Sequence, residues 1–205
     1  MHQIAAADHR VLIWISSLAG RFAPLDYIMR LVVNDYFIIV SISLILLGLW
    51  FWGKKSDERE YNQRAVMIAA ASLGISDGIV KICNLFYYRA RPFIAMPQQP
   101  QLLSTVDKIF YQTHDSSFPS NAAAIVFAAA VTIWFYRHKI GASLCFLALL
   151  MSFARVYAAA HYPLDIIGGA AIGILTSLFC MKILFPLLEP IPTLALKLLR
   201  KFCIA

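Results

Sequence analysis

Long apolar stretches, each about the length needed to cross a lipid bilayer, constrain the fold of this chain more than any other feature. Spanning helices need roughly 17–25 mostly apolar residues. Five stretches of the 205-residue sequence qualify, namely residues 29–52, 65–88, 119–136, 140–160 and 164–188. Charged residues make up only 14% of the chain, against about 25% in soluble domains. The sequence therefore predicts an all-α, polytopic membrane helix bundle that forms a single domain over residues 1–205.

The two ends of the chain are amphipathic. Residues 4–22 are partly apolar but are interrupted by Asp8 and Arg21. We expect this segment to lie as a helix in the membrane interface, with a sixth span as the alternative. The tail, residues 194–202, alternates leucines with lysine and arginine, which also favours a helix on the membrane surface.

Cationic residues gather in segments that fall on one side of the bilayer if the five spans alternate. These segments are residues 53–64, the turn with Arg137 and Lys139, and the C-terminal tail. Short cytoplasmic loops are enriched in lysine and arginine, so this side is expected to be cytoplasmic. Because the cations of the +7 net charge are scattered at segment ends, they favour lipid headgroups and a phosphorylated substrate over nucleic acid.

Arg155, His161 and Asp165 lie on the expected outer side. If the helix continues through this segment, the four-residue spacing places His161 and Asp165 on one face, about 6 Å apart. A carboxylate bonded to one imidazole nitrogen leaves the other free as a nucleophile or base. The arginine needs an anionic partner, so the group leaves room for a phosphate. A purely structural bond between the histidine and the aspartate is the alternative.

The run 117–121 opens the third predicted span, where Ser120 and Asn121 follow Pro119. Such residues are common at helix starts, and plain capping would explain them. The same physics supplies a function, because free backbone N–H groups and the positive end of the helix dipole form an anion site. Ser120 could add a hydroxyl donor there.

The second predicted span ends in Arg89-Ala-Arg91-Pro92. Arginines at a helix exit can anchor to headgroups, but Arg91 is the better candidate for bidentate phosphate binding because the following proline stiffens its backbone. Asp77, Lys81 and Asn84 form one helical stripe within the span. Charges inside a membrane normally pair, so Lys81 could form an ion pair with Asp77. Alternatively, it could extend toward the phosphate.

Together these residues resemble the type 2 phosphatidic acid phosphatase superfamily over about residues 68–174. The third motif of that family is an arginine, five residues, a histidine, three residues and an aspartate, and it is intact here. The first motif keeps Arg91 and its proline, but Asn84 stands where the family has a lysine, with Lys81 one turn earlier.

The short length and the runs 84–93 and 115–120 resemble the bacterial undecaprenyl-diphosphate phosphatases within that superfamily. Those enzymes remove the terminal phosphate of the polyprenyl diphosphate carrier used in wall-glycan synthesis, on the outer side of the bacterial inner membrane. The resemblance implies neither a metal nor a cofactor. It implies that His161 forms a phosphohistidine and that Asp165 orients it. The phosphoryl oxygens would be held by Arg91, Arg155, Ser120 and the backbone at Asn121.

Ala122 departs from the family pattern, which has a histidine there that protonates the leaving oxygen and activates water. Losing a general acid–base typically costs roughly 10²–10⁴-fold in rate, so this chain is expected to turn over slowly. A deliberate histidine-to-alanine substitution and a naturally altered protein are both compatible with the sequence. His114, eight residues upstream, is a candidate substitute donor.

Alternative functions remain open at this point. One is a phosphatase for another lipid phosphate, such as phosphatidylglycerophosphate or lipid A. A phosphotransferase that passes the phosphoryl group to a second lipid is another, and a non-catalytic lipid-phosphate binding protein is a third.

Overall fold

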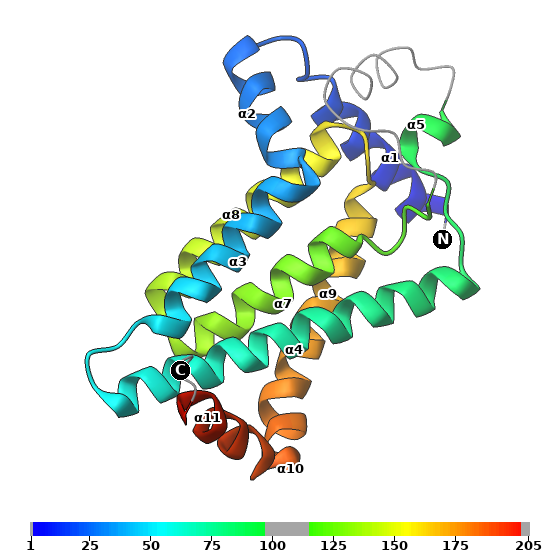
Figure 1. The fold of residues 1–205 in the computed structure, drawn as a ribbon. Coiled ribbons are helices and arrows are strands. Elements are labelled where there is room, and N and C mark those ends of the chain that lie inside the picture. The colour runs from blue at the N-terminus through cyan, green and yellow to red at the C-terminus, as the bar shows by residue number, and fades with distance from the viewer. Residues whose placement is uncertain (1, 97–114, 202–205) are drawn as a thin grey trace.

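The computed structural model describes residues 2–96 and 115–201, and these ranges contain helices without any strand, as the sequence predicts (Figure 1). The helices are α1 (His2–Ser16), α2 (Ala23–Val33), α3 (Asp35–Phe51), α4 (Ser56–Phe86), α5 (Pro92–Ala95), α7 (Asn121–Tyr136), α8 (His138–Tyr157), α9 (Pro163–Phe179), the π-helical turn η1 (Cys180–Leu184), α10 (Phe185–Leu188) and α11 (Ile191–Lys201).

Helix α7 forms the centre of the bundle, where it packs against α4, α8 and α9. Its buried face is rich in alanine, and two glycines of α9 face it. A Cβ atom at Gly169 would lie 2.2 Å from the main-chain oxygen of Ser120, and one at Gly173 would lie 2.3 Å from that of Ala124. Small residues at such interfaces let membrane helices approach closely. This close approach brings the start of α7 against the start of α9.

Within residues 2–96 and 115–201, three helices are long and apolar enough to cross a membrane: α4, α8 and the continuous run Pro163–Leu188. A fourth span is present if α2 and α3 are counted together. Helix α7 is apolar but has only 16 residues. At 15 residues, α1 is shorter than the roughly 17 residues that a span requires, so the alternative of a sixth span is not supported.

Two predicted boundaries are wrong. Residues 29–52 do not form one helix, because the chain bends by 62° between α2 and α3. The side chain of Asn34 accepts a hydrogen bond from the N–H of Tyr36 at 2.9 Å, and asparagine favours such caps over helix interiors. Residues 53–64 are also mostly helical, since α4 begins at Ser56 with Asp57 and Glu58 in its first turn.

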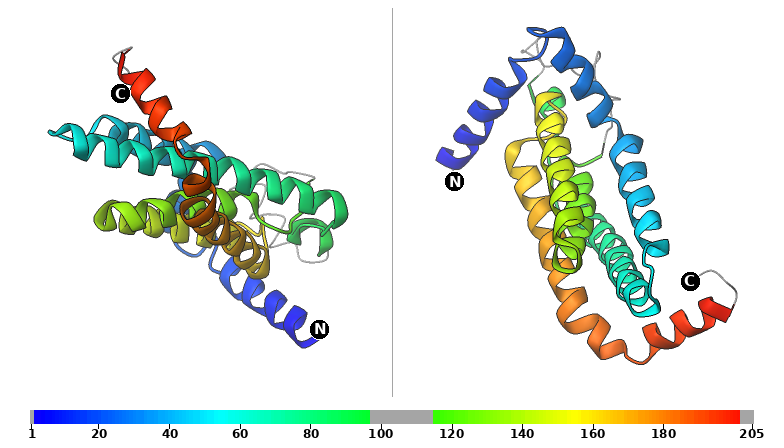
Figure 2. Two further views of the ribbon diagram at one scale, coloured as in Figure 1. Left: turned by 90° about the horizontal axis from the view of Figure 1, so that it is seen from below. Right: turned by 90° about the vertical axis from the view of Figure 1, so that its left-hand side faces the viewer.

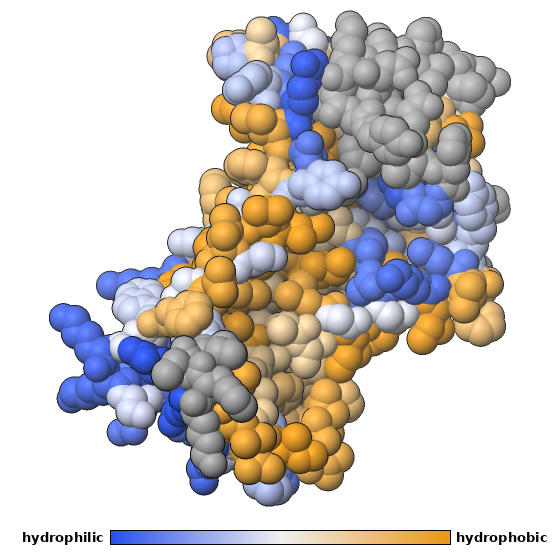
Figure 3. Space-filling model, viewed as in Figure 1, coloured by the Kyte–Doolittle hydropathy of each residue, from blue (hydrophilic) through white to orange (hydrophobic). Residues whose placement is uncertain are grey.

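The two ends of the bundle differ in their composition. The α3–α4 connection, the α7–α8 turn and α11 lie at one end, whereas α1, α5 and the α8–α9 turn lie at the other (Figure 1). Helices α1 and α11 diverge from the bundle at these opposite ends (Figure 2). Apolar side chains cover the middle of the face in Figure 3, with polar residues toward the ends. The arrangement is that of a multi-pass membrane protein.

Candidate active site

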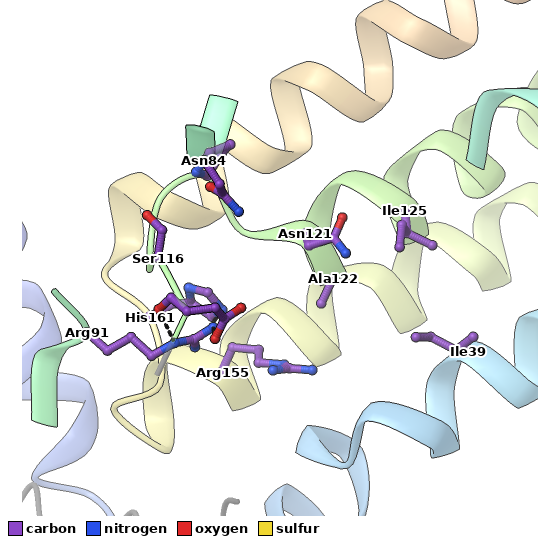
Figure 4. A pocket seen from close by; sticks show the side chains of 11 residues that line it. Ile39, Asn84, Arg91, Ser116, Asn121, Ala122, Ile125, Arg155 and His161 are labelled. Carbon is purple, nitrogen blue, oxygen red and sulfur yellow. Dashed lines mark hydrogen bonds and ion pairs between the residues drawn. The ribbon is translucent and has the colours of Figure 1, made fainter. Parts of the chain in front are cut away.

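A cavity of about 150 Å³ lies at the start of α7. Because a water molecule occupies roughly 30 Å³ in the liquid, this space accommodates a phosphoryl group. Figure 4 shows its polar side chains on α4, on the residue before α5, on the segment before α7 and the first residue of α7, on α8 and on the turn before α9. The cavity is lined by Ile39, Asn84, Arg91, Asp115, Ser116, Pro119, Asn121, Ala122, Ile125, Arg155 and His161.

His161 is buried in the turn that precedes α9, with only 3% of its surface exposed. Its Nδ1 lies 2.8 Å from the main-chain oxygen of Ser117. A carbonyl can only accept, so Nδ1 carries the proton and Nε2 keeps its lone pair. Nε2 lies 3.2 Å from Nη1 of Arg91. Because a guanidinium can only donate, Arg91 donates this hydrogen bond, and the lone pair of Nε2 points toward the buried arginine of the cavity.

His161 and Asp165 are neighbours, as expected, but the predicted hydrogen bond between them is wrong. The helix does not continue through both residues, because α9 begins at Pro163 and a proline disfavours helical backbone in the residue before it. The Asp165 carboxylate lies 3.7 Å from Nδ1, beyond hydrogen-bond distance. The carbonyl of Ser117 holds the imidazole directly, and the Ser117 hydroxyl in turn donates to Asp165.

Burial lowers the pKa of His161 to about 4; Asp165 partly opposes the shift, whereas Arg91 and Arg155 reinforce it. Histidine has an unperturbed pKa of about 6.5. The ring is consequently neutral at pH 7, as a nitrogen nucleophile must be.

Two buried arginines supply positive charge to the cavity. Arg91 is held by the carbonyl of Ala160 at 3.0 Å and by the Asp115 carboxylate at 3.0 Å. Burial lowers its pKa and Asp115 opposes that shift. Arg155, at the end of α8, is 3% exposed and lines the same space. The two arginines lie where sequence reasoning placed phosphate ligands.

The start of α7 contributes Asn121 and Ala122 to the cavity, whereas Ser120 is not among the lining residues. Ser120 is the N-cap, and its hydroxyl accepts from the N–H of Ala123 while its carbonyl accepts from that of Ala124. The N–H groups of Asn121 and Ala122 then have no acceptor within the helix. The Ser120 hydroxyl therefore acts as a helix cap. The main-chain N–H groups of the next two residues are the ones that remain for an anion.

The polar stripe of α4 divides between two roles. Asn84 lines the cavity, and its Oδ1 is buried with no hydrogen-bond partner among the described residues. Lys81 is not a lining residue and pairs with Asp77 at 2.7 Å. Asp77 also accepts a hydrogen bond from the side chain of Asn121 at 2.9 Å. Of the two possibilities for Lys81, the structure contains the ion pair.

Sequence reasoning missed three residues near the site. Ser117 and Asp115 were noted only as members of the runs 117–121 and 115–120, without a role of their own, and Arg89 was considered only as a headgroup anchor. Arg89 bridges Asp165 at 2.5 Å and Asp8 at 2.7 Å. Two arginines so close together at a helix exit were the available signal. His114 lies outside the described residues.

Within residues 2–96 and 115–201, no group of three or more His, Cys, Asp or Glu side chains is placed to hold a metal ion. The positive charge that faces the cavity is supplied by guanidinium groups.

The sequence is similar to that of known phosphatases. It is 28% identical to undecaprenyl-diphosphatase BcrC of Bacillus subtilis (strain 168), over 78% of this chain and 76% of that protein. It is 25% identical to the putative undecaprenyl-diphosphatase YbjG of Escherichia coli (strain K12), over 67% of this chain and 64% of that protein.

The fold is similar to those of two solved structures. LpxE of Aquifex aeolicus superposes with a TM-score of 0.63 at 22% identity, covering 84% of this chain and 93% of that one. The transmembrane PAP2 type phosphatidylglycerolphosphate phosphatase of Bacillus subtilis gives a TM-score of 0.59 at 19% identity, covering 88% and 86%. At these identities the likeness concerns the fold alone.

The profile of the PAP2 superfamily matches residues 65–188, more than half of the chain. This range includes every residue that lines the cavity except Ile39. The resemblance inferred from the three motifs is confirmed: the chain belongs to the PAP2 superfamily.

Proposed function

We propose that this protein binds polyprenyl diphosphates in a bacterial plasma membrane and removes their terminal phosphate through a phosphohistidine at His161. The observation that carries the proposal is the position of Nε2, which keeps its lone pair at a cavity lined by two buried arginines and by the start of α7. Nucleophile, anion ligands and helix dipole converge on one phosphoryl-sized space.

In the first step, Arg91 Nη1 exchanges its hydrogen bond to Nε2 of His161 for one to a phosphoryl oxygen. Nε2 then attacks the terminal phosphorus and the bond to the bridging oxygen breaks. The lipid monophosphate leaves with the electron pair of that bond. Arg91, Arg155 and the N–H groups at Asn121 and Ala122 stabilise the phosphoryl oxygens. The imidazole becomes a cation because Nδ1 keeps its proton, and the Ser117 carbonyl and the Asp165 carboxylate stabilise that charge.

In the second step, a water attacks the phosphohistidine, inorganic phosphate forms and Nε2 regains its lone pair. Both steps benefit from a proton-transfer group on the side of the leaving oxygen, and Ala122 has none. Phosphate is a less basic leaving group than an alkoxide, so a diphosphate tolerates the missing donor better than a phosphomonoester. Slow turnover of this chain follows.

The substrate class rests on two supports. The sequence relatives named above are undecaprenyl-diphosphatases, at 28% and 25% identity. In addition, Ile39 and Ile125 give the cavity an apolar wall toward α3 and α7, which suits a phosphate carried on a hydrocarbon chain.

The test is phosphate release by the Ala122→His variant from farnesyl diphosphate and from phosphatidic acid in detergent micelles. We expect this variant to exceed the unmodified chain by about 10²–10⁴-fold and to prefer the diphosphate. The variant that carries both Ala122→His and His161→Ala is the control and should release none.

Three results would count against the proposal. A preference for phosphatidic acid would refute the diphosphate assignment. Turnover that survives loss of His161 would refute the nucleophile. Tight binding of both lipids without release, even after Ala122→His, would favour the non-catalytic lipid-phosphate binder that the alanine raises as a second candidate.

A further inference from the structure

Arg89 links the N-terminal helix to the proposed active site although it does not line the cavity. One guanidinium nitrogen donates to Asp165 Oδ1 at 2.5 Å and the other donates to Asp8 Oδ2 at 2.7 Å. The guanidinium also lies 3.8 Å from the centre of the Tyr162 ring. A residue of α1 is thus connected to the acid beside His161 through a single side chain.

The pairing is buried on both sides. The side chains of Asp8 and Asp165 are fully shielded, and that of Arg89 is 19% exposed. Removing one partner of a buried ion pair leaves an uncompensated charge and is strongly destabilising. Asp8 has a second contact, because its Oδ1 accepts from the N–H of Leu164 at 2.9 Å and caps α9. Asp8 therefore contacts α9 directly through Oδ1, and its Oδ2 is linked to Asp165 of the same helix through Arg89.

Arg89 also fixes the segment that holds the imidazole. Its main-chain oxygen accepts from the N–H of Ser117 at 2.8 Å. Ser117 then orients Nδ1 of His161 through its carbonyl, and its hydroxyl donates to the oxygen of Asp165 that Arg89 leaves free. Arg89 thus positions three residues, directly for Asp165 and Ser117 and through Ser117 for His161.

Leu12, one turn beyond Asp8, completes the docking of α1. It is fully buried and packs in a cluster with Phe93, Val156, Ala159 and Tyr162. The ring of His9 stacks on Tyr162 with centroids 5.2 Å apart. Helix α1 is therefore held against the α8–α9 turn by apolar packing as well as by charge.

We propose that Asp8 is a positioning residue for the nucleophile: by anchoring Arg89 it holds Asp165 and Ser117 in the geometry that presents Nε2 of His161 to phosphorus. Asp8 lies outside residues 65–188, the range that matches the family. The inference rests on the proposed function, since it takes His161 as the nucleophile.

The experiment compares binding of orthovanadate and of inorganic phosphate to the purified chain by isothermal titration calorimetry. Vanadate accepts a fifth ligand and so forms a bond to a positioned histidine, whereas phosphate requires only the anion ligands. Asp8→Asn is the informative variant, because the amide oxygen can still cap Leu164 while the ion pair to Arg89 is lost. Asp57→Asn, the same chemical change at an exposed position of the opposite end, is the matched control.

We expect Asp8→Asn to weaken vanadate binding by about 10-fold or more, since loss of a group that orients a ligating histidine typically costs roughly 10–100-fold in metal sites. Phosphate affinity should change less than about 2-fold, and Asp57→Asn should change neither. In an Arg89→Gln background, Asp8→Asn should have no further effect. If Asp8→Asn does not fold, Arg89→Lys gives the same comparison, because lysine keeps the charge beside Asp165 but cannot span two carboxylates.

Equal weakening of vanadate and phosphate, or an undiminished effect of Asp8→Asn in the Arg89→Gln background, would overturn the proposal and leave Asp8 as a helix cap. The His161→Ala variant separates this failure from failure of the proposed function. If it binds vanadate as tightly as the unmodified chain, the nucleophile is wrong and the positioning role falls with it.

Discussion

At the scale of single residues, the site depends on a histidine that stays neutral inside a positively charged pocket. The pKa of His161 is about 4 because the ring is buried, with Asp165 opposing and Arg91 and Arg155 reinforcing the shift. In the unfolded chain the ring would titrate near about 6.5. Below that pH the imidazole is protonated in the unfolded chain. In the folded chain it stays neutral until the pH falls to about 4.

Stability should therefore fall on acidification. The contribution of His161 is present above pH 6.5 or so and is lost as pH falls toward about 4, to a total of about 3 kcal/mol. We expect the unmodified chain to lose more unfolding free energy between these limits than a His161→Gln variant, measured by denaturant unfolding in detergent. Parallel pH profiles for the two proteins would contradict this assignment.

Residue identities were predictable from the sequence where the chemistry demands a particular side chain. Arg91, Arg155 and His161, which the sequence singled out as candidates for a phosphate site, line one cavity. The partner of Nδ1 was not predictable, because a main-chain carbonyl carries no sequence signal and Ser117 reaches it from another segment. Asp8 was interpreted only as an interruption of an apolar segment. Its ion pair could not be predicted, because its partner Arg89 is distant in the sequence.

At the scale of elements, the contact between α7 and α9 sets the site geometry. The N–H of Ser120 donates to the main-chain oxygen of Asp165 at 3.0 Å, and this bond requires the backbones to meet at Gly169. Apolar periodicity indicated both helices but not the break at Asn34, where capping by an asparagine side chain outweighs a hydrophobic run. Helix ends are governed by local hydrogen bonds that hydropathy does not record.

Gly169→Ala should damage the site through this contact. The added Cβ would lie 2.2 Å from the Ser120 oxygen, which belongs to backbone and cannot rotate away. We expect a loss of about 1–3 kcal/mol in stability and weaker phosphate binding, measured by thermal unfolding and by calorimetry. Gly74→Ala in α4 is the matched control, because a Cβ there meets nothing within 4 Å. Equal behaviour of the two variants would refute the close-contact argument.

At the scale of the whole molecule, the cationic connections and the candidate active site lie toward opposite ends of the bundle. The α3–α4 connection, the α7–α8 turn and α11, which carry the cationic residues, lie at the end opposite to the α8–α9 turn (Figure 1), as the alternation of spans predicted. The positive-inside rule assigns that end to the cytoplasm, and we infer that the cavity opens on the outer side. The placement of α1 in the membrane interface stays a prediction.

Cysteine labelling tests this orientation. In a variant without native cysteines, a cysteine at Tyr88, near the cavity, should react with a membrane-impermeant maleimide in intact spheroplasts. A cysteine at Lys55, in the α3–α4 connection, should react only after lysis. Both positions are exposed, so the contrast reports sidedness rather than burial. The reverse pattern would invert the assignment.

The shortness of α7 has a consequence for how a headgroup meets this protein. Sixteen residues span about 24 Å, whereas the hydrocarbon layer is about 30 Å thick. If the Arg137 end of α7 sits at one boundary, its other end stops short of the opposite boundary by the height of about one helical turn. A diphosphate headgroup would then have to move below the headgroup plane to reach the cavity. It would lose bound water on the way, while its hydrocarbon chain stayed in the lipid.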